Sequence, residues 1–203
     1  MTQRNSKKQA IIDHATLIFA DRGFASASMS DVAARAEVAS ASIFYHFKSK
    51  EELYIAVLAN AKNGILQEFS GYLARAFFES GLDKLLSCVA FHLHLSESRR
   101  AWFLLLQHPF THELAETSAV CRVHLHDIYS CLLNVFEDAL KQGQEDGSIR
   151  AVPVNKTALI ILAAIDGLRQ LERHNLYAAS SLFIELLQLC RYMLSSSLPQ
   201  QNL

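Results

Sequence analysis

The sequence predicts an all-α fold, and three observations lead to this prediction. Apolar residues recur at helical spacing along most of the chain, as Ile11, Ala15, Ile18 and Phe19 do near its start. Only three prolines and seven glycines punctuate 203 residues, which suits long helices better than many tight turns. No strand-like alternation is longer than a few residues. With 51% hydrophobic and 19% charged residues, the chain has enough apolar material for a proper core.

The first fifty residues are expected to form three helices. The first runs from about Ser6 to Asp21 and ends at Gly23. Ser28 is a good N-cap for the second helix, and an aspartate three residues later resembles a capping box. After a break at residues 37–39, a third helix covers about 40–47. Its Ile43 and Phe47 are four apart and are expected to pack inward.

The remaining residues are expected to form about six further helices, or about nine in all. They are placed at 50–78, 82–93, around 102–106, 121–139, 155–174 and 178–197. Pro109 is expected to interrupt the aromatic helix around 102–106, and Gly147 to end the long helix before it. We therefore expect a small domain over residues 1–50 and a larger one over 51–203.

Charge is unevenly distributed along the chain. Residues 1–50 hold seven Lys/Arg and four Asp/Glu, a net of +3, whereas residues 51–203 hold twelve and sixteen, a net of −4. A basic end on an acidic body suits a module that meets a polyanion at one end only. No apolar run approaches the ~20 residues of a membrane span, no signal-peptide pattern is present, and the cysteines form no CxxC pair. These features predict a cytoplasmic protein with reduced thiols and no membrane partner.

Residues 28–50, SMSDVAARAEVASASIFYHFKSK, are the most informative segment. Two short helices separated by a turn of three or four residues form a helix-turn-helix, whose second helix can enter the major groove of DNA. From the pattern alone, an ordinary helical hairpin with its aromatic residues packed elsewhere remains an alternative.

This part of the chain resembles the TetR family of bacterial repressors. The family pattern has a Gly-Phe pair after the first helix, a Thr/Ser-capped second helix, and then a run close to AGVSxGTLYxHFxSKEEL. The matching stretches here are Gly23-Phe24, Ser28, DVA at 31–33, AEV at 36–38, IFYHF at 43–47 and SKEEL at 49–53. The rest matches loosely, although GSIR at 147–150 and DGL at 166–168 are similar to stretches near the family's dimerisation helix.

The resemblance implies DNA-facing roles for eight residues, which are Ser28, Ser40, Ala41, Ser42, Tyr45, His46, Lys48 and Lys50. Tyr45 and His46 can hydrogen-bond phosphate oxygens, and Lys50 is expected to be a point charge for the backbone. Three departures from the pattern have consequences. Glu37 replaces a turn glycine, Ala39 replaces a capping Ser or Thr, so that Ser40 would cap instead, and Phe44 replaces a tyrosine and lacks its hydroxyl.

The predicted recognition helix has few groups that can read bases. Before Lys48 its exposed side carries no Arg, Lys, Asn or Gln, the residues that make bidentate contacts with guanine or adenine. Ser40 and Ser42 offer single hydrogen bonds, and Ala41 offers a methyl group to thymine. We therefore expect specificity to depend on thymine-rich edges and on DNA shape.

For the body, the resemblance implies an effector pocket and a dimer interface made by the last two helices. Plain core packing is the alternative for each aromatic residue of the pocket. The expected ligand is a largely apolar organic molecule with one polar group. The candidate pocket residues are Phe69, Tyr72, Phe91, His92, Trp102, Phe103, His124 and Ile128. The candidate interface residues are Leu159, Leu162, Ala163, Gly167, Leu171, Leu182, Leu186, Leu189, Cys190 and Met193.

The function expected from these features is that of a ligand-responsive repressor. As a homodimer it would bind a palindromic double-stranded operator and be released by a small-molecule effector, without a cofactor or bound metal. A metal-responsive regulator is one alternative, because six of the nine histidines lie between His92 and His126. Two of the histidine pairs are two residues apart, however, and so point to different sides of a helix. A helical enzyme is the other alternative, but no nucleophile elbow, P-loop or HExxH motif occurs, and we expect no enzymatic activity.

Overall fold

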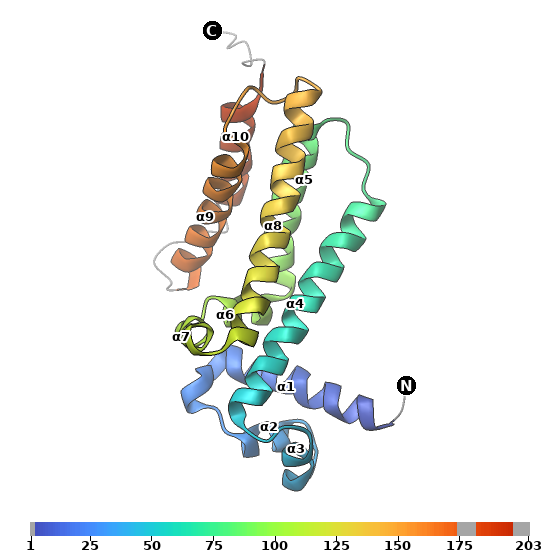
Figure 1. Cartoon of the computed structure of the whole chain (residues 1–203), viewed down its shortest axis with the longest axis vertical. Helices are drawn as coiled ribbons and strands as arrows, with labels where there is room; N and C mark the ends of the chain where they lie inside the picture. Colours follow the sequence, from blue (N-terminus) through green and yellow to red (C-terminus); the bar gives the residue numbers. More distant parts are fainter. Residues whose placement is uncertain (1–2, 174–181, 197–203) are drawn as a thin grey trace. The chain divides into compact units, whose positions relative to one another are not determined.

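The computed structural model is built from α-helices (Figure 1) and describes residues 3–173 and 182–196. Within these ranges the only β pairing is an isolated bridge between Ile149 and Ser195, and no helix is long and apolar enough to cross a membrane. The all-α prediction is confirmed. The helices are α1 (Gln3–Ser26), α2 (Met29–Arg35), α3 (Ser40–His46), α4 (Lys50–Arg75), α5 (Gly81–Ser98), α6 (Arg100–Leu106), α7 (Pro109–Thr117), α8 (Ala119–Glu145), α9 (Val154–Arg173) and α10 (Phe183–Leu194).

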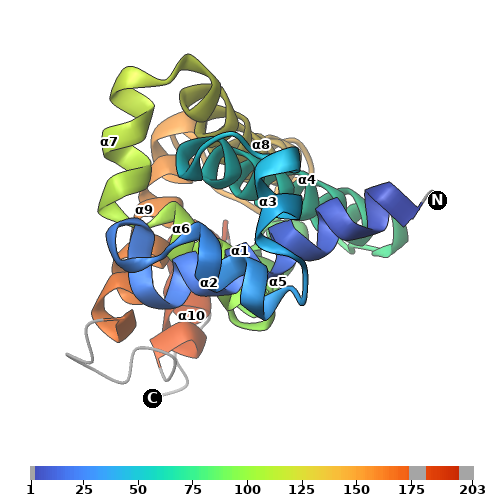
Figure 2. The same cartoon turned by 90° about the horizontal axis from the view of Figure 1, so that it is seen from below.

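The chain divides into two compact units. Unit 1 comprises Met1–Gly71 and Arg99–Ile128, and unit 2 comprises the described parts of Tyr72–Ser98 and Tyr129–Leu203. Helices α4 and α8 therefore contribute residues to both units. Unit 1 contains α1, α2 and α3, which contact one another in chain order (Figure 2), and also α6 and α7.

The predicted inward face of α1 is confirmed, because Ile11, Ala15, Ile18 and Phe19 are all buried. Helical geometry is broken at Gly23, which has φ 73° and ψ 171°. A Cβ atom there would lie 2.7 Å from Nε2 of His108 in the turn between α6 and α7. Both the backbone conformation and the close approach of His108 therefore require glycine at this position.

The predicted capping box of α2 is also present. The backbone N–H of Asp31 donates to Oγ of Ser28 at 3.0 Å, and the N–H of Ser28 donates to Oδ2 of Asp31 at 3.2 Å. The hydroxyl of Ser28, which also donates to this carboxylate, and the N–H of Ser28 lower the pKa of the Asp31 carboxyl. The start of α2 is thus defined by a local sequence signal.

Two departures from the family pattern make the turn between α2 and α3 less favourable. Glu37 adopts φ 53°, the left-handed region that the family's glycine enters without a steric penalty. Ala39 is the N-cap of α3 and supplies no side-chain hydrogen bond. The expectation that Ser40 caps the helix was wrong, since Ser40 is its first residue.

The segment around Pro109 differs from the expectation. Pro109 does not interrupt a helix but occupies the first turn of an additional one, α7, which brings the described helices to ten. Proline is favoured there because the first helical N–H groups have no intrahelical partner. His108 is the N-cap, and its Nδ1 accepts from the N–H of Phe110 at 3.2 Å. Helix α4 also ends earlier than expected, at Arg75. The expected helix ends at His174 and Ser197, and the expected start at Ala178, lie outside the described residues.

Replacing Glu37 by glycine should stabilise the protein. Removing the Cβ at φ 53° relieves a steric penalty that exceeds the added entropy of the unfolded chain, so we expect the free energy of unfolding to rise by about 0.5–1 kcal/mol. Urea unfolding at one fixed protein concentration measures the change. Glu37→Ala keeps the Cβ and is the matched control. An equal gain in both variants would show that the side-chain charge, and not the backbone, is responsible.

Candidate functional site

The short helix α3 presents a distinct outer face. Ile43 and Phe47 are buried as predicted, and α3 contacts α2 in unit 1. The exposed positions are Ser40, Ala41, Phe44 and Tyr45, whereas Ser42 and His46 are half-buried. Positions i, i+1, i+4 and i+5 lie on one side of a helix, so the exposed residues form one continuous face.

Of the predicted DNA-facing residues outside α3, Ser28 and Lys48 lie on the surface. The hydroxyl of Ser28 is engaged in the capping box and donates to Asp31 at 2.7 Å. Lys48 is exposed, and its backbone N–H donates to the carboxylate of Glu52 at 2.8 Å. Two lysines of α1 add positive charge: Lys7 and Lys8 are exposed, and the ammonium of Lys8 lies 5.5 Å from the ring of Phe47, next to the end of α3.

The side chain of Lys50 lies differently from the outward position that the resemblance implied. Its ammonium does not extend outward but donates to the carbonyl oxygens of Phe24 at 2.7 Å and Ala27 at 2.9 Å, with a longer contact of 3.4 Å to Ala25. It also lies 4.3 Å from the centre of the Phe24 ring. In this structure the ammonium hydrogens of Lys50 are used within the chain, at and just after the end of α1, and we expect them to stay there when DNA is bound.

An aromatic cluster joins the end of α1 to α4 and α7 within unit 1. The ring of Phe24 stacks on that of Phe110, with centroids 3.7 Å apart and planes 7° from parallel, and it meets Tyr54 edge-on. Thr111 donates its hydroxyl hydrogen to the carbonyl of Leu105, so the buried hydroxyl of Tyr54 is the donor to Thr111 over 2.6 Å. Burial raises the pKa of Tyr54 to about 12, which keeps this donor protonated. The sequence gives no sign that Phe110 and Thr111 belong to this cluster, because only the fold brings them to the end of α1 and to α4.

Five of the predicted effector residues lie in unit 1, namely Phe69, Trp102, Phe103, His124 and Ile128. Trp102 packs directly on α4, where a Cβ at Gly64 would lie 2.3 Å from its ring. The guanidinium of Arg99 lies 5.2 Å from the same ring. His124 is half-buried, and desolvation and the nearby charge of Lys62 lower its pKa.

The other three predicted effector residues, Tyr72, Phe91 and His92, lie in unit 2. The rings of Tyr72 and Phe91 stack at 4.1 Å and 5°. His92 is fully buried, and burial lowers its pKa to about 3, so its imidazole is neutral at physiological pH. Unit 2 also contains an ionisable residue that the sequence analysis missed: burial raises the pKa of Asp166 to about 6. No group of three or more His, Cys, Asp or Glu side chains in the described ranges is arranged to hold a metal ion.

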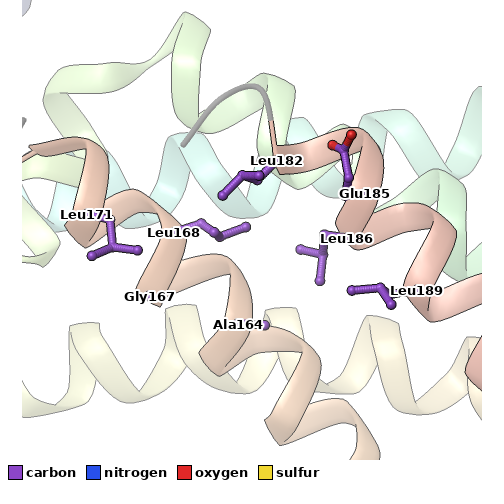
Figure 3. Close-up of a pocket in the computed structure, with 8 residues that line it drawn as sticks. All are labelled: Ala164, Gly167, Leu168, Leu171, Leu182, Glu185, Leu186 and Leu189. Atoms are coloured by element: carbon purple, nitrogen blue, oxygen red, sulfur yellow. The ribbon is translucent and has the colours of Figure 1, made fainter. Parts of the chain in front are cut away.

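Helices α9 and α10 form an apolar groove of about 590 Å³ in unit 2 (Figure 3). Figure 3 shows leucine side chains of both helices in the space between them. A Cβ added at Gly167 would meet no atom within 4 Å, so this position is open. The lining residues are Ala164, Gly167, Leu168, Leu171, Leu182, Glu185, Leu186 and Leu189.

The structure divides the predicted interface residues into two groups. Leu162 and Cys190 are buried inside the single chain, 5% and 6% exposed, and so have little surface to offer a second copy. The other predicted residues are at least partly exposed. Further exposed apolar side chains that the sequence analysis missed are Ile160, Ile184 and Tyr192.

Lys50→Ala should lower stability and leave the electrostatics of DNA binding nearly unchanged. Losing a charged donor at the end of α1 should reduce the free energy of unfolding by about 1–3 kcal/mol. The slope of log affinity against log salt should stay close to the wild-type value. The control is Lys48→Ala, for which we expect a slope lower by about two per dimer, one per half-site. A loss of two in Lys50→Ala would show that this ammonium contacts phosphate after all.

Comparison with known proteins agrees with this geometry. Residues 11–57 match the family model described as bacterial regulatory proteins of the tetR family. The relative named "Probable HTH-type transcriptional regulator ArpR", from Pseudomonas putida, is 30% identical over 180 residues, which cover 81% of this chain and 82% of the relative.

Solved structures share the fold. A crystal structure from Saccharomonospora viridis in complex with choline superposes with a TM-score of 0.83 at 18% identity, covering 95% of this chain and 100% of that one. The regulator FadR from Bacillus subtilis in complex with stearoyl-CoA gives 0.70 at 21% identity, covering 91% and 98%. Together with the relative from P. putida, the match over the helix-turn-helix shows that the chain belongs to the TetR family and is a DNA-binding transcriptional regulator.

Proposed function

We propose that this regulator is a repressor that binds a palindromic operator as a homodimer and is released by a small organic effector. The observation that carries the proposal is the exposed face of α3, which is held on a buried core and flanked by exposed lysines. We assign DNA binding to residues 1–50, and effector binding and dimerisation to residues 51–203. Its partner DNA would place the protein in the cytoplasm.

The proposed contacts with DNA are mostly with the backbone. Lys7, Lys8 and Lys48 supply charge, and Tyr45 and His46 supply hydrogen-bonding groups. Ser40, Ala41 and Ser42 complete the contact surface, and Ser28 supports it through the α2 cap. Two recognition helices in a dimer require half-sites about one helical turn, ~34 Å, apart. Without bidentate readers, the ratio of specific to nonspecific affinity should lie toward the low end of the ~10³–10⁷ range. Selection from random duplexes, followed by gel shift, tests operator binding, and failure to enrich any sequence would contradict it.

The proposed dimer interface is the outer surface of α9 and α10. This surface combines the apolar groove with exposed Leu159, Ala163, Leu189 and Met193. A monomer gains nothing from keeping so many apolar side chains in water, and a two-fold dimer would bury them. Gly167 is open in the single chain, which suits a close approach of a second copy.

Gly167→Phe should convert the dimer to a monomer without unfolding it. A Cβ atom at this position meets no atom within 4 Å in the single chain, and glycine is a poor helix former, so the variant chain should stay folded. The bulky ring would separate the two copies, and sedimentation at micromolar concentration should give a 22.7 kDa species. Val123→Phe is the matched control, because Val123 is an exposed residue of α8 outside this surface. A Gly167→Phe variant that remains a dimer would place the interface elsewhere.

We propose that the effector is bound by those of the predicted residues that lie in unit 1, around Trp102 and His124. Similarity to structures that hold choline and stearoyl-CoA supports an organic ligand with an apolar part. The packing of Trp102 on Gly64 could transmit effector binding to the DNA-binding helices through α4. Helix α4 begins at Lys50, whose ammonium contacts the end of α1. An effector can release DNA only by as much as it prefers the body shape that disfavours DNA binding.

Trp102 is the only tryptophan, so its fluorescence should report effector binding. Ligands that release DNA are expected to shift or quench its emission, because the ring lies against α4 and below Arg99. Choline and stearoyl-CoA are the first probes, with gel shift on the selected operator as the parallel measurement. A chemically related compound that leaves DNA bound is the control. Release without any change in emission would put the effector site away from Trp102.

A further inference from the structure

The exposed face of α3 is unusually apolar for a surface that meets DNA. Phe44 and Tyr45 are 54% and 67% exposed, although each could have been a small or charged residue at no cost to the core. Ala41 is exposed one turn before them. A methyl group and two aromatic rings thus form one strip, and the only polar groups on the face are the hydroxyls of Ser40 and Tyr45.

An apolar strip on a recognition helix has one apolar counterpart in the major groove. Guanine, cytosine and adenine present hydrogen-bonding atoms there, and thymine alone adds an apolar group, its C5 methyl. The first fifty residues carry a net charge of +3, and the exposed lysines Lys7, Lys8 and Lys48 flank the strip. Of these lysines, Lys8 lies 5.5 Å from the ring of Phe47 and Lys48 directly follows α3, so positive charge is present at this end of the helix. This charge favours a polyanion as the occupant over a second protein surface.

We propose that Phe44 is a specificity-determining residue that reads the C5 methyl groups of thymine, next to the methyl group of Ala41. The proposal rests on the operator binding proposed above. The phenyl ring lacks a hydroxyl and so cannot bond a phosphate, but its apolar edge can cover a methyl group and exclude water from it. Thymine recognition by this protein then depends on a van der Waals surface and not on hydrogen bonds.

Replacing thymine by deoxyuridine tests the proposal, because it removes the methyl group and leaves base pairing and hydrogen-bonding groups unchanged. With the selected operator and the full-length protein at fixed salt, one or two thymines in each half-site should weaken binding when replaced. We expect a loss of about fourfold for each buried methyl, or ~16-fold when both half-sites carry one substitution. Phe44→Ala should bind the thymine operator more weakly and show almost no further loss with deoxyuridine.

Two variants serve as controls. Phe77→Ala removes an equally apolar ring, 89% exposed, from the segment between α4 and α5, and it should keep the full deoxyuridine effect. Phe44→Leu keeps an apolar group and should keep part of the effect. Circular dichroism and unchanged nonspecific DNA binding would show that Phe44→Ala is folded. If Phe44→Ala does not fold, the deoxyuridine effect is measured with Phe44→Leu instead.

The outcomes separate this inference from the proposed function. If an operator is selected but deoxyuridine costs nothing at any position, methyl recognition is overturned and operator binding stands. If the deoxyuridine effect persists in Phe44→Ala but is lost in Tyr45→Ala or Ala41→Gly, the reader is a neighbour and not Phe44. If no duplex is selected, both the operator proposal and this inference fail.

Discussion

The ammonium of Lys50 lies on carbonyl oxygens at and just after the end of α1, where the chain leaves α1 for the helix-turn-helix. Helix ends leave carbonyl groups without intrahelical partners, and here one cation satisfies that of Phe24, in the last turn of α1, and also binds that of Ala27, just after the helix. Because Lys50 is also the first residue of α4, the same contact ties α4 to the end of α1. The junction lies directly before Ser28, the N-cap of α2.

The junction extends into the α6–α7 segment by contacts of a different kind. Phe24 stacks on Phe110, His108 lies against Gly23, and Tyr54 donates to Thr111. Each of these contacts requires a specific shape: a flat face, an absent Cβ, or a buried donor with one acceptor. Such an assembly does not deform gradually, so a displacement of α7 would have to move or release the end of α1 as a whole.

The two functional surfaces expose apolar groups for different reasons. On α3 the exposed rings lie on a seven-residue helix whose inward positions are already filled by Ile43 and Phe47. Between α9 and α10, leucine side chains line an apolar groove together with the open position at Gly167. In both places the single chain leaves these apolar side chains at least partly exposed. Under the proposed function, DNA covers the first surface and a second copy covers the second.

Local patterns determined much of this protein. The spacing of Ile11, Ala15, Ile18 and Phe19 predicted the buried face of α1, the Ser28–Asp31 pair predicted the α2 cap, and the motif through Leu53 identified the family. These features depend on neighbours within one or two helical turns, which a sequence displays directly.

What the tertiary structure decided concerns contacts between distant residues. Lys50 had the charge and position of a phosphate contact, but carbonyl groups 23 to 26 residues away hold its ammonium. Leu162 and Cys190 had the apolar character and helical phase of interface residues, yet they are buried in the single chain, because the rotation of a helix about its axis is set by its neighbours. Phe110 and Thr111 gained their roles only when α7 met α1. The sequence gives the chemical type of each residue, but the tertiary structure determines which distant residue it contacts.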